Sequence, residues 1–172
     1  MDFFNQTGKL AIGSRLRMLT DKITVDAAAI YKMFGVDLKP KWFPVFFVLS
    51  RGEAKTITSI AKEIGHSHPS VSNIIKEMVA KGLVKETKDK SDGRRNMVML
   101  SAKGKRMSDS FSEQCIDVTA AIEQITQQTR NDLWEAIEEW ENLLLDKSLL
   151  ERVKEAKKER ESKDCLLYTS DA

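Results

Sequence analysis

The sequence lacks the features of a membrane protein, a disulfide-bonded protein or a metalloprotein. No apolar run approaches the roughly 20 residues that a membrane-spanning helix needs, and the N-terminus does not have the order of a signal peptide. Only two cysteines are present, Cys115 and Cys165, and neither has a Cys or His neighbour at metal-ligand spacing. We therefore expect a cytoplasmic protein with free thiols that contacts no membrane and binds no metal or cofactor.

Catalytic motifs are also lacking. The sequence contains no glycine-rich phosphate loop, no serine or cysteine nucleophile motif and no HExxH pair of metal ligands. His66 and His68 stand two residues apart at the start of a predicted helix and face different ways, which favours a role in a cap or at a binding surface over metal binding. We expect that the protein is not an enzyme.

Glycine and proline are scarce, and charge is unevenly distributed. The chain has 8 Gly and 3 Pro, while 31% of its residues are charged, which favours helices over a sandwich or barrel. Lys and Arg outnumber Asp and Glu by thirteen to six in residues 51–106, whereas the acidic residues lead by sixteen to eight in residues 107–172. A basic middle of this kind indicates a phosphate-binding surface, although chance clustering on a solvated face gives the same counts.

Hydrophobic periodicity predicts long helices at both ends of the chain. Apolar residues at three- and four-residue steps predict a helix over residues 8–34 that ends at Gly35. The following KWFPVFFVLSRG predicts a short helix buried nearly all round, because its apolar residues exceed one helical face. From Ala102 the helical period lasts almost to the end, with a break near residues 127–131, where Thr129 is the expected N-cap of a last helix.

Two short amphipathic helices and a hairpin lie between these long helices. The first begins at Thr56 or Thr58 and ends at Gly65, and the second is capped by Ser67 and ends at Gly82. The tight GHS connection predicts a helix-turn-helix. Short β-type runs at residues 83–87 and 96–100 flank the turn-rich KDKSDGRR and predict a hairpin. The expected fold class is mainly α: a winged helix-turn-helix with a small β-hairpin wing and long terminal helices.

The second helix of a helix-turn-helix lies in the major groove of DNA. Its apolar positions, Val71, Ile74, Ile75 and Met78, are expected in the core. The outward positions carry small or hydrogen-bonding side chains that suit bases and phosphates, although each could also be merely solvated: His68, Pro69, Ser70, Ser72, Asn73 and Lys76.

The hairpin tip is the second candidate contact with DNA. Cations flank a turn at Ser91-Asp92-Gly93, and an arginine there could enter a minor groove; these cations are Lys88, Lys90, Arg94 and Arg95. Asp92 is expected to orient Arg94 through a charge-assisted hydrogen bond. A surface hairpin with incidental basic residues is the alternative.

The segment from Ile57 to Gly104 resembles the MarR (multiple-antibiotic-resistance regulator) family. The resemblance is carried by ITSIAKEIGHSHPSVSNIIKEMVAKGLV and then DKSDGRRNMVMLSAKG. It implies a DNA-binding lobe over about residues 52–106, a homodimer built from helices in residues 1–38 and 107–162, and a palindromic double-stranded DNA operator. Residue by residue, Ser70, Ser72, Asn73 and Lys76 match the recognition helix, Arg94 the wing arginine and Asp92 its partner.

The dimer has independent support, because the apolar stripes of the terminal helices exceed what a lone monomer would bury, unless they pack only on their own chain.

The resemblance also implies a pocket for a small aromatic effector. Trp42, Phe43, Phe46 and Phe47 lie near the expected place, although such a cluster can be simple core. Cys115 has no adjacent His and is interpreted as a structural thiol.

Two other interpretations stay open. Some relatives continue into an acetyltransferase domain, and residues 164–172 continue neither the helical period nor a polar tail. Residues 1–163 could then be the DNA-binding half of a longer protein, with 164–172 as an irregular tail, non-native or truncated. A winged helix can also serve protein contacts instead of DNA, and only DNA binding should then depend steeply on salt.

Overall fold

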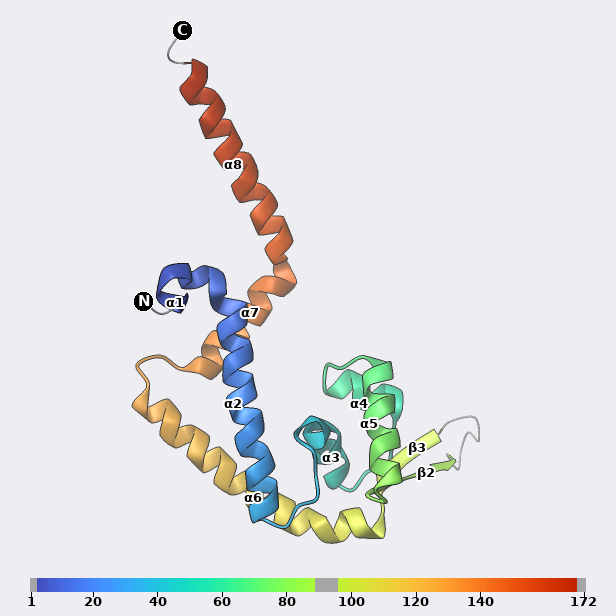
Figure 1. The fold of residues 1–172 in the computed structure, drawn as a ribbon. Helices are drawn as coiled ribbons and strands as arrows, with labels where there is room; N and C mark the ends of the chain where they lie inside the picture. Colours follow the sequence, from blue (N-terminus) through green and yellow to red (C-terminus); the bar gives the residue numbers. More distant parts are fainter. Residues whose placement is uncertain (1–2, 89–95, 170–172) are drawn as a thin grey trace. The chain divides into compact units, whose positions relative to one another are not determined.

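Residues 3–88 and 96–169 are described by the computed structural model, with side chains up to residue 163 (Figure 1). The chain divides into two compact units, residues 1–118 and 119–172, which are treated one at a time. Within the part of the chain that the structure describes, none of the helices is long and apolar enough to cross a membrane.

The first unit begins with three helical segments where one was predicted. Helix α1 (Phe3–Thr7) leads into the 3-10 turn η1 (Gly8–Ala11) and then into α2 (Ile12–Met33). Gly8 has φ +54°, a left-handed conformation that interrupts the α-helical path, so the prediction of a continuous helix from residue 8 is wrong at its start. Its predicted end is confirmed, because Gly35 has φ +66° and directly follows the last turn of α2.

The next helix is less buried than predicted. After the 3-10 turn η2 (Pro40–Trp42), helix α3 (Phe43–Ser50) buries Val45, Phe46, Val48 and Leu49. Phe43 and Phe47 keep 39% and 36% of their surface exposed. The two exposed rings are four residues apart and therefore share one face of α3. The prediction of a helix buried nearly all round is thus wrong on this face.

The helix-turn-helix is confirmed together with both of its predicted caps. Helix α4 (Ile57–Glu63) is capped by Thr56, whose Oγ1 accepts a hydrogen bond from the Ser59 amide at 3.1 Å. Helix α5 (His68–Ala80) is capped by Ser67 and has Pro69 in its first turn, where the missing N–H is not needed. Figure 1 shows α5 leading directly into the hairpin.

The hairpin belongs to a three-stranded antiparallel sheet with the order β1-β3-β2. Strands β2 (Val84–Lys88) and β3 (Asn96–Leu100) pair from Val84 opposite Leu100 to Lys88 opposite Asn96. The third strand, β1 (Lys55–Thr56), pairs with β3 and was not predicted. It holds the start of α4 against the base of the wing.

The sheet is joined to helix α6 (Ala102–Gln128) by a tight backbone junction. Ser101 donates from its amide to the Leu83 carbonyl at 2.9 Å and from its hydroxyl to the Gly82 carbonyl at 2.6 Å. The Gly104 amide in turn donates to Ser101 Oγ at 3.1 Å. These bonds fix the end of α5 against the start of α6, and Gly104 makes the approach possible because a Cβ there would lie 2.2 Å from the Leu83 oxygen.

The second unit contains the end of α6 and two further helices, α7 (Leu133–Asp146) and α8 (Leu149–Thr169). Asp132 caps α7 by accepting hydrogen bonds from the amides of the next turn, whereas the Thr129 hydroxyl donates to the Thr126 carbonyl. The prediction of Thr129 as the cap is therefore wrong. The predicted break between α6 and α7 is itself confirmed. A second break, which was not predicted, occurs at Ser148, which forms a capping box with Glu151.

The end of the second unit also corrects the sequence interpretation. Helix α8 extends through residue 163 to Thr169, so the backbone is helical where an irregular tail was expected. Helix α7 is amphipathic, yet none of its residues is buried. Its apolar face is thus left open to solvent.

Candidate nucleic-acid interface

Helix α5 separates its buried and exposed residues as the sequence predicts. Its core side is formed by Val71, Ile74, Ile75 and Met78, all buried. Five of the six outward residues are exposed and Ser72 is half-buried; the exposed ones are His68, Pro69, Ser70, Asn73 and Lys76. The structure thus brings the predicted recognition residues together on one open face. That this face contacts DNA stays a prediction.

An ion cluster holds one flank of α5 to the segment before α3. Glu77 accepts hydrogen bonds from the Lys41 ammonium at 2.6 Å, the Trp42 indole N–H at 3.0 Å and the Lys39 ammonium at 3.4 Å. The Lys41 bond, the Trp42 bond and the charge of Lys39 hold the pKa of Glu77 at about 2, well below its usual 4.5. Sequence analysis did not single out Glu77. Its partners are 35 to 38 residues away, so no local pattern announces them.

A hollow of about 510 Å³ lies beside the start of α5. It is lined from four elements, by Thr56 of β1, by Ile57 and Thr58 of α4, by His68 of α5, and by Asn96 at the start of β3. Of these, only His68 was predicted as a site residue. Thr58 was interpreted as a possible cap and Asn96 as the start of a strand, and no local pattern indicated that the two residues meet.

Only the base of the wing belongs to the described residues. Lys88 is exposed at the end of β2 and lies opposite Asn96 in the hairpin register. The other four predicted wing residues, Lys90, Asp92, Arg94 and Arg95, lie outside the described residues, and the predicted pairing of Asp92 with Arg94 stays a prediction.

The predicted effector residues differ in their surroundings. Trp42 and Phe46 are 1% and 0% exposed and belong to the core, so a ligand could reach them only by opening it. Phe43 and Phe47 are partly exposed and pack against Phe111 of α6, with ring centroids 5.8 and 6.4 Å away. The Arg51 guanidinium lies 5.0 Å from the centre of the Phe47 ring. An aromatic face bordered by one cation is therefore the accessible part of this cluster.

A buried polar contact joins α2 to α6 beneath these rings. Gln114 is only 4% exposed, and its Oε1 has no hydrogen-bond partner among the described residues. Burial, with Cys115 nearby, raises the pKa of Tyr31 to about 12, while a hydrogen bond with Gln114 opposes the shift. Burial also raises the pKa of Cys115. A raised pKa disfavours the reactive thiolate, which supports the interpretation of Cys115 as a structural thiol.

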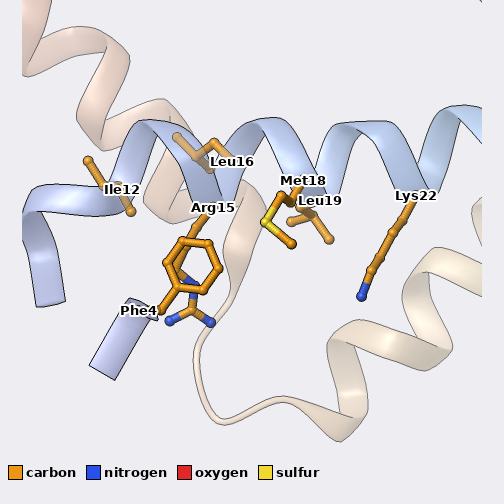
Figure 2. A pocket seen from close by; sticks show the side chains of 7 residues that line it. All are labelled: Phe4, Ile12, Arg15, Leu16, Met18, Leu19 and Lys22. Carbon is orange, nitrogen blue, oxygen red and sulfur yellow. The ribbon is translucent and has the colours of Figure 1, made fainter. Parts of the chain in front are cut away.

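A second hollow, of about 340 Å³, lies along the N-terminal half of α2. Figure 2 shows its lining side chains, with the Phe4 ring of α1 beside Arg15 and the apolar side chains of α2 alongside. The Arg15 guanidinium lies 5.6 Å from the centre of the Phe4 ring. The apolar side chains of α2 around it stay exposed: Ile12, Leu16, Met18 and Leu19. Within residues 3–88 and 96–163, no three His, Cys, Asp or Glu side chains are grouped so that they could hold a metal ion.

Comparison with known proteins identifies a family match and confirms the fold. The sequence model of the MarR family matches residues 36–95. The transcriptional repressor CouR, bound to a 23-mer DNA duplex, has a TM-score of 0.60 and 20% identity, over 81% of this chain and 96% of that chain. The PcaV transcriptional regulator from Streptomyces coelicolor, in complex with its natural ligand, has a TM-score of 0.58 and 13% identity, over 79% and 92%. The adhesin competence repressor AdcR from Streptococcus pyogenes has a TM-score of 0.57 and 19% identity, over 78% and 95%. No curated protein matches the sequence.

Proposed function

We propose, on the premise that residues 36–95 of this chain belong to the MarR family, that the protein is a transcriptional regulator that binds a palindromic DNA operator as a homodimer. The observation that carries the proposal is the outward face of α5, where small and hydrogen-bonding side chains stand exposed while the opposite side is anchored in the core. A helix of this kind can enter the major groove and place side chains against base edges.

The residues of this face divide between base and backbone contacts. The Asn73 amide can pair with the edge of an adenine through two hydrogen bonds, and Lys76 can bind a phosphate or a guanine. Ser70 and Ser72 are short enough to let the helix approach the duplex closely. The bonds from Lys39, Lys41 and Trp42 to Glu77 hold one flank of α5, so the helix can present these groups in a fixed orientation.

The homodimer is supported by apolar surface in both units. In the first unit α2 exposes Ile12, Leu16, Leu19 and Ile23 along one side, part of which lines the second hollow, shown in Figure 2. In the second unit α7 exposes Trp134, Ile137, Trp140, Leu143 and Leu144. Continuous apolar faces of this size are costly in water, and a second copy of the chain would cover them. A two-fold dimer would place two recognition helices about 34 Å apart, one turn of the duplex.

A small aromatic effector is the second part of the proposal. The exposed rings of Phe43 and Phe47, with Arg51 beside them, offer stacking surface and one positive charge to an aromatic anion. Such a ligand would act by changing the affinity for DNA, which requires that it binds the free and the DNA-bound conformations unequally. Titration of aromatic carboxylates against the protein–operator complex tests this, and release of DNA by none of them would count against an effector at this face.

The experiment for the proposed function is selection of an operator from a random duplex pool, followed by footprinting. We expect two half-sites related by a two-fold axis and separated by about one helical turn. Asn73→Ala should weaken binding to the selected operator and relax the preference at one base position, by about 1–3 kcal/mol. Asn131→Ala, an exposed asparagine in the second unit, is the matched control and should bind as the wild type does. Recovery of no sequence, or equal effects of both substitutions, would contradict the proposal.

A further inference from the structure

We propose that the hollow between α4, α5 and β3 binds one backbone phosphate of the duplex, held by Thr58, His68 and Asn96. This inference rests on the proposed function and extends the contact from His68, at the start of the recognition face, to Thr58 of α4 and Asn96 of β3. The three side chains come from three separate elements and line the same hollow, whose volume of about 510 Å³ is ample for a phosphate group and part of its sugar.

The hollow offers hydrogen-bond donors with no competing use. The Thr56 hydroxyl already accepts the Ser59 amide as the cap of α4, and Ile57 is apolar. Thr58, His68 and Asn96 are all exposed, and none of their side chains has a hydrogen bond or ion pair with another described residue. A threonine hydroxyl, an imidazole N–H and an asparagine amide can each donate to a phosphate oxygen.

The charges around the hollow favour an anion. No Asp or Glu belongs to its described lining, and the first turns of α4 and α5 contain no acidic residue. Lys88 lies opposite Asn96 in the antiparallel register of β2 and β3. Directly opposite residues project to the same face of a sheet, so the Lys88 ammonium adds positive charge on the side of the hairpin where Asn96 lies.

The position of the hollow indicates the backbone of the same duplex. His68 is the first residue of α5, so the hollow adjoins the end of the helix whose N-terminal side chains would reach the bases. On its other side the hollow reaches the base of the wing through Asn96. A duplex that contacted both α5 and the wing would therefore run past this hollow with its backbone. Phosphate contacts of this kind set the register of a protein on DNA without reading sequence.

The test uses Thr58→Val and Asn96→Ala in the full chain, with binding measured on a selected operator and on a random-sequence duplex. A hydrogen bond to a charged group supports a loss of about tenfold in affinity for each substitution. The loss should be the same factor on both duplexes, because a phosphate contact carries no sequence information. Thr87→Val is the matched control: Thr87 pairs with Met97, one residue from Asn96, and so projects to the opposite face of the hairpin. It should change affinity by less than twofold.

Two outcomes would overturn the inference while leaving the proposed function intact. Wild-type affinity in both variants would show that the hollow holds no phosphate. A loss confined to the operator would assign the hollow to base recognition. Failure of the wild type to bind any duplex would instead refute the proposed function itself. Circular dichroism of each variant verifies that the fold is retained.

Discussion

Gly104→Ala should destabilise the protein by weakening the junction between the DNA-binding lobe and α6. Gly104 lies in the first turn of α6, directly against the end of the α5–β2 connection. A Cβ at this position would lie 2.2 Å from the Leu83 carbonyl oxygen and 3.3 Å from two atoms of Leu100. The backbone of α6 would therefore have to move away by roughly 1 Å to reach an ordinary contact distance.

The magnitude follows from the bonds that share this junction. The Leu83 oxygen accepts the Ser101 amide at 2.9 Å, so the same movement weakens that bond. Overpacking costs about 1–3 kcal/mol, and the weakened hydrogen bond costs about 1 kcal/mol more. Alanine gains up to about 1 kcal/mol over glycine in a helix. We expect a net loss of about 2 kcal/mol in the free energy of unfolding.

Urea denaturation followed by tryptophan fluorescence measures this loss. The matched control is Gly13→Ala, because Gly13 also lies in the first turn of a long helix and has no atom within 4 Å of an added Cβ. That substitution should leave stability unchanged or raise it by up to about 1 kcal/mol. If Gly104→Ala were as stable as Gly13→Ala, the close approach of α6 to Leu83 would be refuted.

Three further predictions concern the ion cluster, a helix cap and the wing. The pKa of Glu77 is lowered to about 2 from 4.5, so its contribution to stability is present above pH 4.5 and is lost as the pH falls toward 2. Between these pH values the urea midpoint of Glu77→Gln should fall less steeply with pH than that of the wild type. Equal dependence of the two midpoints on pH would contradict the ion cluster. Asp132→Ala removes the acceptor for the amides of Trp134 and Glu135 and should lower the free energy of unfolding by about 1 kcal/mol. An unchanged free energy of unfolding would mean that the cap is not formed in solution. Arg94→Ala should weaken operator binding several-fold or more with the fold intact, and an unchanged gel shift would count against the predicted wing contact.

Local signals predicted most of the DNA-binding lobe. Thr56 and Ser67 occupy cap positions that their hydroxyls favour, and the apolar spacing after each of them is helical. The hairpin was placed to within one residue, because short runs of β-type residues stand on both sides of a turn-rich segment. These features depend on neighbours within a few residues, which a sequence displays directly. For the same reason the inward side of α5 could be separated from its outward side.

Long-range pairing accounts for most of what was missed. Strand β1 is two residues long and is defined only by its pairing with β3, some forty residues away. The contacts of Glu77 and the hollow at Thr58 likewise join segments that are far apart in the chain. The caps of α7 and α8 are a different case, since Asp132 is followed by Glu135, and Ser148 by Glu151, at the spacing of a capping box. Those two signals were readable and were overlooked.

The most direct measurement is the affinity of the purified protein for duplex DNA as a function of salt concentration. A regulator that neutralises several phosphates should bind at low salt and lose about 10³-fold or more in affinity between roughly 50 and 200 mM salt. We predict that steep loss, with a smaller slope when Lys76 is replaced by Gln. Absence of binding at low salt, or an affinity that does not depend on salt, would contradict the assignment of α5 to the surface of DNA.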